Sequence, residues 1–215
     1  TLTGTWTISN GLSYTAFNNL NFIGSATVQL PGDVSGLSFK HCILSTSGSL
    51  INSTSTTNNG DITISNCSGH TTIVISSPSL TLTFANNIGS IAGFNITVSG
   101  DSLIKSSTGI SSITHNGGVC EILEISDLGG ITSAASNNDT DSLIIRNSSL
   151  SNNDGTWNVL NKTGTCDYIF QNVSRLSTQD VINGNRIEFS NTDDDIGNVI
   201  KVDTVTGSYT VSSNC

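Results

Sequence analysis

The sequence predicts an all-β chain folded as a parallel β-helix, a solenoid in which short strands stack coil upon coil. Three observations lead to this fold class. Ser and Thr together number 63 and Asn 25 among the 215 residues, a composition that favours strands and turns over helices. A short motif returns about every 20 to 25 residues, the period of a solenoid. Each copy alternates apolar residues with other residues, which is the period of a strand.

The motif is an apolar residue, any residue, a second apolar residue, any residue and then Asn, as in "ITISNC" (62–67). Its seven copies begin at Leu37, Ile62, Leu82, Leu123, Leu143, Tyr168 and Ile187. The 41 residues between Leu82 and Leu123 correspond to two coils. We expect the intervening copy near Leu103, where Lys105 breaks the pattern.

The residue that ends each motif stands where a coil turns a corner. Asn tolerates the left-handed backbone of a tight corner. In coils stacked about 4.8 Å apart, its side-chain amide can donate to one neighbour and accept from the other. We therefore expect a buried, internal asparagine ladder at His41, Asn66, Asn86, Asp127, Asn147, Asn172 and Asn191.

The repeated strand and its ladder resemble the right-handed parallel β-helix of the pectate-lyase-like superfamily, which includes many phage tailspikes and other virion or cell-surface fibres. Seven copies, between residues 37 and 191, carry this resemblance. No linker divides the chain, so we expect one domain over residues 1–215. Residues 1–36 should form a cap and the first coil, residues 37–191 the regular coils and residues 192–215 the C-terminal cap.

The residue after each motif start should point away from the core. Ile144 and Ile169 hold this position on adjacent coils and form an apolar strip, a feature that marks an interface or a covering loop. The resemblance implies that three such solenoids pack about one axis. A homotrimer is therefore the expected assembly, and a filament of coils stacked end to end is the alternative.

Charge and hydropathy limit the other partners. The net charge of −9, with only seven Lys and Arg, argues against nucleic acid, because a phosphate-binding surface needs clustered cations. No apolar run is long enough to cross a bilayer, so membrane insertion is not expected. The composition, rich in Ser, Thr, Asn and Gly and poor in Lys, favours an extracellular, virion or cell-surface location.

Five cysteines without a CxxC pair argue against a zinc module. Cys42 and Cys67 follow the ends of their motifs on consecutive coils, where a disulfide and two buried thiols fit equally well. The seven Asn-X-Ser/Thr sequons are no more than this composition produces by chance. Loop-like sequence makes Asn52, Asn138 and Asn161 the expected sites if any sequon carries a glycan.

Acidic residues provide the one candidate for catalysis or metal binding. Glu121 and Asp141 each stand two residues before a motif start, which places their Cβ atoms roughly 5 Å apart on successive coils. Such a pair can act in a glycosidase, or can hold Ca²⁺ together with Asp101. Acids that simply form the turn before a strand give the same pattern. Lyases of the superfamily that the chain resembles use several Ca²⁺-binding acids beside an essential Arg or Lys. That set is incomplete here, so enzyme activity is uncertain and on balance not expected.

The leading hypothesis is a non-catalytic fibre or spike module for adhesion or receptor binding to a glycan. Trp157, with Asp139 and Asp141 nearby, is the candidate contact, because an exposed ring stacks on a sugar and carboxylates accept its hydroxyl groups. A place for Trp157 in the core is equally compatible with the sequence. The alternatives are a polysaccharide-degrading, tailspike-type glycosidase or lyase that uses Glu121 and Asp141, and a self-assembling structural subunit of an extracellular filament.

Overall fold

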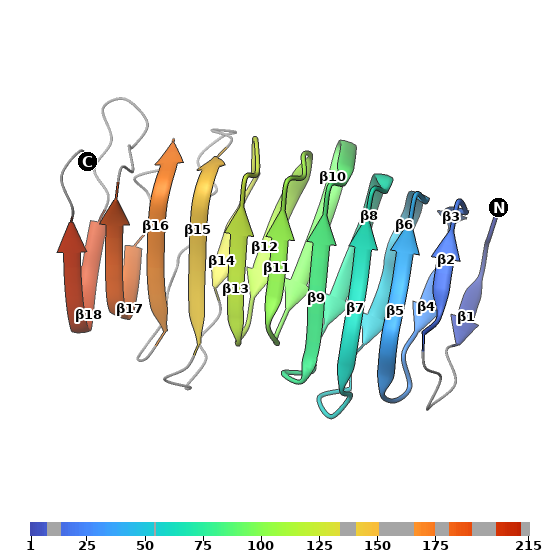
Figure 1. The fold of residues 1–215 in the computed structure, drawn as a ribbon, viewed down its shortest axis with the longest axis horizontal. Helices are drawn as coiled ribbons and strands as arrows, with labels where there is room; N and C mark the ends of the chain where they lie inside the picture. The colour runs from blue at the N-terminus through green and yellow to red at the C-terminus, as the bar shows by residue number, and fades with distance from the viewer. Residues whose placement is uncertain are drawn as a thin grey trace.

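The computed structural model describes residues 1–7, 14–53, 55–133, 141–150, 166–174, 181–190 and 201–211. In this part of the chain the regular secondary structure consists of β-strands alone, and every strand pair is parallel. The strands stack as a β-solenoid of about seven turns, which confirms the predicted fold class (Figure 1). The described residues contain no helix long and apolar enough to cross a bilayer.

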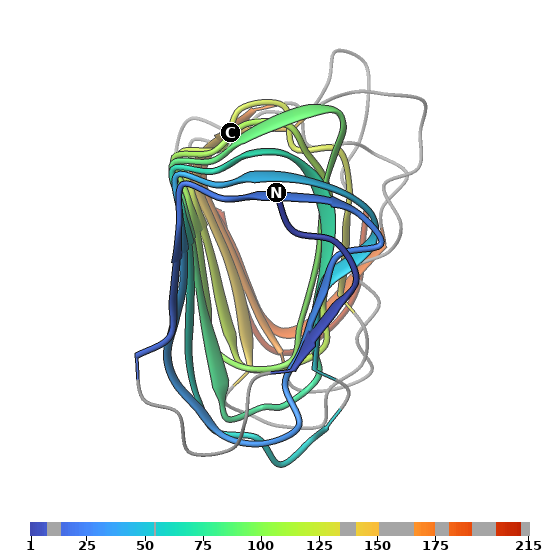
Figure 2. The ribbon, with the colours of Figure 1, turned by 90° about the vertical axis from the view of Figure 1, so that its right-hand side faces the viewer.

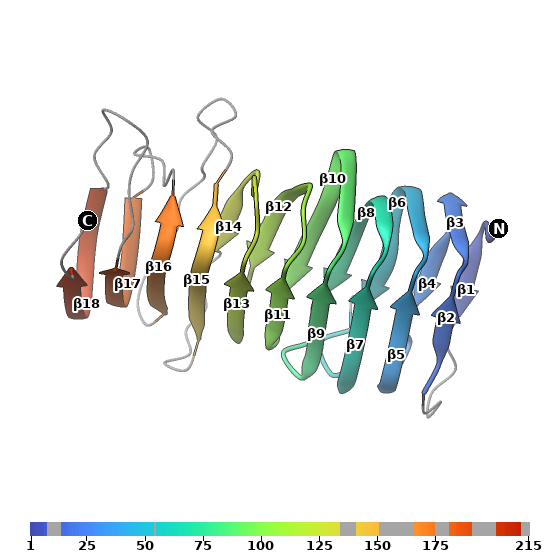
Figure 3. The ribbon, with the colours of Figure 1, turned by 45° about the horizontal axis from the view of Figure 1, so that its top comes forward.

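Two parallel sheets form the long faces of the solenoid, as the view along its axis shows (Figure 2). The ten-stranded sheet contains β2 (Ala16–Asn18), β5 (Val34–Lys40), β7 (Gly60–Ser65), β9 (Leu80–Ala85), β11 (Ser102–Lys105), β13 (Val119–Leu123), β15 (Ser142–Ser149), β16 (Asp167–Ser174), β17 (Val181–Ser190) and β18 (Lys201–Val211). The eight-stranded sheet contains β1 (Thr5–Thr7), β3 (Asn21–Gly24), β4 (Thr27–Gln29), β6 (Ile43–Ser53), β8 (Ser68–Ile75), β10 (Ile88–Val98), β12 (Ile110–His115) and β14 (Ile131–Ser133). Register shifts inside β6, β8 and β10 mark a bend within the eight-stranded sheet (Figure 3).

The coil-to-coil register agrees with most of the predicted motif. The predicted starts stack in two runs, Leu37, Ile62 and Leu82 in the first and Leu143, Tyr168 and Ile187 in the second. The intervening copy, expected near residue 103, begins at Ser102, which pairs with Leu82. Strand alternation therefore located six of the seven predicted starts.

One coil is placed wrongly by the sequence pattern. Ser102 pairs with Cys120, and Cys120 pairs with Leu143, so this coil begins three residues before the predicted start at Leu123. Leu123 is only half-buried on the outer side, whereas Ile122 is fully buried. The pattern failed because Cys120 occupies a position that an apolar residue holds in most other coils.

A residue in the left-handed region stands at each described corner of the ten-stranded sheet; at six corners it directly follows the strand, and at the other two, Asn147 and Asn172, it lies within β15 and β16. The φ angles at these corners lie between 47° and 56°. The corner N–H still donates to the next coil, from Asn66 to Ala85 O and from Glu124 to Arg146 O, each at 3.1 Å. The corner residues are Asn19, His41, Asn66, Asn86, Ser106, Glu124, Asn147 and Asn172. Asp127 also has a positive φ, 55°, but lies outside this column.

The structure does not show the internal asparagine ladder. The six described members of the predicted ladder (His41, Asn66, Asn86, Asp127, Asn147 and Asn172) have exposed side chains. The reason is that a left-handed residue interrupts strand alternation, so its own side chain turns outward and the next one turns inward. One hydrogen bond, from Asn172 Nδ2 to Asn147 Oδ1 at 2.8 Å, joins two exposed members. Asn191 lies outside the described residues.

The residue after each corner forms a buried column that links the coils. Asn87 is 1% exposed; its Oδ1 accepts from the Cys67 N–H at 2.8 Å, and its Nδ2 donates to Ile64 O at 3.0 Å. Ser107 Oγ in turn accepts from the Asn87 N–H at 3.0 Å. These side chains pair backbone groups of the neighbouring coil that would otherwise be buried without a partner. The inner column consists of Cys42, Cys67, Asn87, Ser107, Ile125, Ser148 and Val173.

Apolar side chains fill the interior as one cluster, from Phe22 to Phe189 among the described residues. Aromatic rings stack between successive coils: the Phe17 and Phe39 ring centroids lie 5.0 Å apart. The rings of Phe170 and Phe189 lie 5.1 Å apart. Neighbouring coils are therefore joined both by backbone hydrogen bonds and by contacts between their apolar side chains.

We expect Asn87→Ala to destabilise the fold by about 2–4 kcal/mol, because it leaves a buried N–H and a buried carbonyl without partners. Asn86→Gly is the matched control, since Gly adopts the left-handed corner readily and the Asn86 side chain is exposed. Urea unfolding followed by circular dichroism measures both. Equal losses for the two variants would contradict the role of the inner column.

Candidate functional site

The predicted pair of carboxylates does not form. Glu121 pairs in register with Ile144, and its side chain points outward and is 32% exposed. Asp141 lies three residues before Ile144, is 3% exposed and accepts the Gly118 N–H at its Oδ1 at 2.8 Å. The two carboxylates thus lie on opposite sides of the sheet. The predicted glycosidase pair and the Ca²⁺ site through both acids are therefore wrong, and the cause is the misplaced coil start at Leu123.

In the described part of the chain, no group of three or more His, Cys, Asp and Glu side chains could hold a metal ion. The aspartates at the coil turns instead accept backbone hydrogen bonds from neighbouring coils. Asp61 Oδ1 accepts the Gly36 N–H at 3.1 Å, and Asp101 Oδ1 accepts the Val119 N–H at 2.9 Å. The interpretation of these acids as turn-forming residues therefore has direct structural support.

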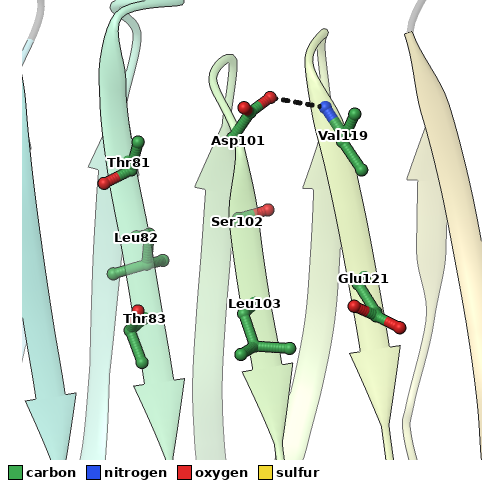
Figure 4. A pocket seen from close by; sticks show the side chains of 8 residues that line it. All are labelled: Thr81, Leu82, Thr83, Asp101, Ser102, Leu103, Val119 and Glu121. Atoms are coloured by element: carbon green, nitrogen blue, oxygen red, sulfur yellow. Dashed lines mark hydrogen bonds between the residues drawn. The ribbon is translucent and has the colours of Figure 1, made fainter.

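A shallow groove of about 360 Å³ lies on the outer face of β9, β11 and β13 (Figure 4). It is lined by Thr81, Leu82, Thr83, Asp101, Ser102, Leu103, Val119 and Glu121. In Figure 4 the side chains of Thr81 and Thr83 stand on one strand, those of Asp101 and Leu103 on the next, and that of Glu121 on the third. Hydroxyl groups, carboxylates and apolar side chains, among them Leu103 and the exposed Val119, therefore share a single hollow.

The coil register places these side chains on the same face. Thr83 pairs with Leu103, and Leu103 pairs with Glu121, so the three occupy one outward position on successive coils about 4.8 Å apart. Asp101 stands two residues before Leu103 and hence also points outward. Its position is diagonal to Glu121, with a Cα separation of about 7–8 Å. The groove is thus a direct product of strand alternation in three stacked coils.

A polar network extends from the groove across the outer face. Arg146 on β15 donates through Nη1 to Glu121 Oε1 and through Nε to Gln171 Oε1, the latter at 2.8 Å. Gln171 Nε2 donates to Glu188 Oε1 at 3.5 Å, and Arg186 forms an ion pair with Glu188. The partly exposed Arg146–Glu121 pair adds only about 0–1 kcal/mol to stability because water screens it. Its main effect is to hold the Glu121 side chain at the groove rim.

The sequence pattern pointed to Glu121 and Asp101 for the wrong geometry. It placed Thr83 on the outer face without making it a site residue, and it missed Leu103. It assigned the outward column to Ile104 and Glu124 in these coils, but Ile104 is fully buried and Glu124 is a corner residue. The signal that identifies the groove is the residue after each coil start, once the starts are placed correctly. Two of the three coil starts that frame the groove are polar or weakly apolar, which obscured that signal.

The remaining predicted sites are placed as follows. Trp157, Asp139, Asn138 and Asn161 lie outside the described residues. Asn52 is exposed on β6, as a glycosylation site requires. Ile144 and Ile169 pair on adjacent coils, and both are half-buried on the outer face.

Cys42 and Cys67 stack as two buried thiols rather than as a disulfide. The Cys42 thiol donates to Lys40 O and the Cys67 thiol to Ser65 O, each at 3.3 Å. Cys67 Sγ also accepts the Cys42 N–H at 3.4 Å. Burial raises the pKa of the Cys67 thiol to about 11. Both cysteines therefore act as members of the inner column.

No protein-family model, curated protein or solved structure matches the chain. The groove must therefore be interpreted from its own residues and geometry.

We expect stability to fall as the pH rises above about 9. In the unfolded chain the Cys67 thiol loses its proton near its ordinary pKa of 9.0, whereas the folded thiol keeps it to about 11. Between these values the unfolded state binds fewer protons, so the free energy of unfolding decreases with pH, by at most about 1.4 kcal/mol per pH unit for one thiol. Urea unfolding from pH 8 to 10 measures the slope, and Cys67→Ser should reduce it. The same slope in both proteins would exclude Cys67 as its origin.

Proposed function

We propose that this protein is a non-catalytic surface module of a fibre or spike that binds a neutral glycan through the groove on β9, β11 and β13. The observation that carries the proposal is the composition of that groove. The carboxylates of Asp101 and Glu121 accept hydrogen bonds from sugar hydroxyl groups, and the hydroxyls of Thr81 and Thr83 both donate and accept. Leu103 offers an apolar surface to the C–H face of a sugar ring.

Charge favours a neutral ligand over an anionic one. Neither Lys nor Arg lines the groove, and the chain carries a net charge of −9. The nearby Arg146 guanidinium is already paired with Glu121. An anionic polymer would be repelled by the two rim carboxylates and by the overall field, whereas an uncharged polymer with many hydroxyl groups would not.

The solenoid geometry favours an extended ligand. Successive coils present equivalent outward positions about every 4.8 Å, a spacing comparable with the length of one sugar ring. A polymer aligned with the solenoid axis would thus meet Thr83, Leu103 and Glu121 in sequence. Lateral faces of solenoids form extended binding surfaces for this reason.

The wider setting of the proposal comes from the sequence resemblance. The apolar alternation and the left-handed Asn corners support a relation to right-handed β-helices of the pectate-lyase-like type, including phage tailspikes. That relation would place the protein at a virion or cell surface, or outside the cell. The binding function rests on the groove instead, because one fold hosts many activities.

The contacts that the rim carboxylates make favour ligand binding over hydrolysis. Glu121 is held by Arg146, and Asp101 accepts the Val119 N–H. Both carboxylates are thereby fixed as hydrogen-bond acceptors, the role that ligand recognition requires.

The test compares two equivalent threonines. Thr83→Val removes a groove hydroxyl with little change of shape, and Thr63→Val makes the same change one coil away, outside the groove, at the residue that pairs with Thr83. Neutral oligosaccharides are first screened on an array, and the best is titrated by calorimetry. Thr83→Val should weaken binding about tenfold, the effect of one lost hydrogen bond, and Thr63→Val should leave it unchanged.

Equal affinities for the two variants, or no binding of any neutral glycan, would contradict the proposal. Sedimentation and electron microscopy of the purified protein accompany the titration. Filaments that form from the pure chain, without glycan binding, would instead support a structural subunit.

A further inference from the structure

The interior of the solenoid becomes polar in its later coils. Three buried side-chain oxygens, Ser102 Oγ, Asp141 Oδ2 and Tyr168 Oη, have no hydrogen-bond partner in the part of the chain that the structure describes. Their residues are 7% exposed or less. Buried polar groups in folded proteins are nearly always paired with protein atoms or with ordered water. Three such oxygens within four successive coils therefore require an explanation.

Direct hydrogen bonds connect part of this region, between the ten-stranded sheet and the ends of β12 and β14. His115 is fully buried; its Nδ1 lies 3.1 Å from Ser133 Oγ and its Nε2 lies 3.0 Å from Gly118 O. Because a carbonyl can only accept, Nε2 carries the proton and donates it. The Gly118 N–H then donates to Asp141 Oδ1 at 2.8 Å. Asp141 Oδ2 is the unpaired end of this chain of contacts.

The coil register relates the other two unpaired oxygens, because Ser102, Cys120, Leu143 and Tyr168 hold one inward position on four successive coils. Burial raises the pKa of Tyr168 above its ordinary value and Cys166 adds to this rise, whereas interaction with the Ser133 hydroxyl, which does not meet the geometry of a direct hydrogen bond, lowers it. Burial likewise raises the pKa of Cys120 to about 12, with the adjacent Ser102 hydroxyl lowering it and Cys166 raising it. We call the buried polar residues Ser102, His115, Asp141 and Tyr168 the polar seam.

Gly117 lies beside the Asp141 carboxylate and has no side chain. The atoms nearest to a Cβ placed on Gly117 would be Ser99 O at 3.2 Å and Asp141 Oδ2 at 3.7 Å. No side chain from this residue therefore covers the unpaired oxygen. The adjacent Ser99 carbonyl is a second acceptor facing the same position.

We propose that the polar seam binds ordered internal water, which completes the hydrogen bonds of Asp141 Oδ2, Tyr168 Oη and Ser102 Oγ. A buried water makes about three hydrogen bonds, and the seam offers both donors and acceptors. A cation fits less well, because Ca²⁺ takes six to eight oxygen ligands and usually several carboxylates. Asp141 is the only Asp or Glu that the described residues bring to the seam. This inference does not depend on the proposed glycan binding.

Tyr168→Phe tests the proposal because it removes one hydroxyl and little else. Loss of a water-mediated hydrogen bond should lower the thermal unfolding midpoint by about 2–4 °C. Tyr14→Phe is the matched control, since Tyr14 is 82% exposed, and it should leave the midpoint unchanged. A midpoint that stays the same or rises in Tyr168→Phe would show that the hydroxyl has no partner and would overturn the proposal.

Nuclear magnetic resonance provides the direct measurement. Cross-relaxation between water and the Gly118 amide proton, with the sign of a long-lived complex, is the expected result, and its absence would refute the water site. The thermal unfolding midpoint measured with added Ca²⁺ and with EGTA tests whether a cation, instead of water, binds in the seam. A midpoint that rises with Ca²⁺ in the parent but not in Asp141→Asn would assign the seam to a cation and overturn the assignment to water.

Discussion

The left-handed residue at each corner is the constraint on which the rest of this structure depends. At most corners it ends the strand of the ten-stranded sheet, and it directs the chain toward the second sheet. This conformation costs most L-residues roughly 1–2 kcal/mol, and Asn adopts it more readily than most. Five of the eight described corners are accordingly Asn, namely Asn19, Asn66, Asn86, Asn147 and Asn172. At the other three corners, His41, Ser106 and Glu124, a backbone hydrogen bond to the next coil supports the same conformation.

The corner also explains why the inner column is polar in an otherwise apolar core. Where the chain turns, the N–H of the residue after the corner no longer points at a carbonyl of the next coil. In Cys67 that N–H donates to Asn87 Oδ1, and in Asn87 it donates to Ser107 Oγ. A side chain from the neighbouring coil thus replaces the missing backbone acceptor, which is why Asn, Ser and Cys rather than Leu or Ile occupy most of this column.

Sequence periodicity predicted the strands and the corners but not the side on which each acid would lie. Alternating apolar residues identify a strand reliably because the core demands them, as at Ile62 and Ile64. They cannot identify a coil whose first inward residue is Ser102 or Cys120. A shift of three residues exchanges the two faces of the strand. The pattern with its start at Leu123 placed Glu121 beside Asp141. With the start at Cys120, Glu121 points outward at the groove rim.

The ladder shows a second limit of the same kind. The motif located five of the described corner residues correctly, namely His41, Asn66, Asn86, Asn147 and Asn172, but it gave Asp127 in place of Glu124. The direction of each corner side chain depends on how the backbone leaves the corner, which no residue type specifies. The hydrogen-bonding role assigned to Asn66 and Asn86 consequently belongs to their successors, Cys67 and Asn87.

The groove and one end of the polar seam lie in the coils whose pattern is weakest, and strand alternation explains why both occur there. In β11 and β13, Ser102 and Cys120 point inward while Leu103 and Glu121 point outward. Polar and small inward residues make the interior receptive to water and supply less apolar contact than Leu or Ile would. The apolar residue displaced from the interior is found instead on the outer face, where Leu103 forms part of the groove floor between Thr83 and Glu121. A local inversion of the hydrophobic pattern at Ser102 and Leu103 therefore places a buried hydroxyl of the polar seam on one side of the sheet and an apolar groove residue on the other.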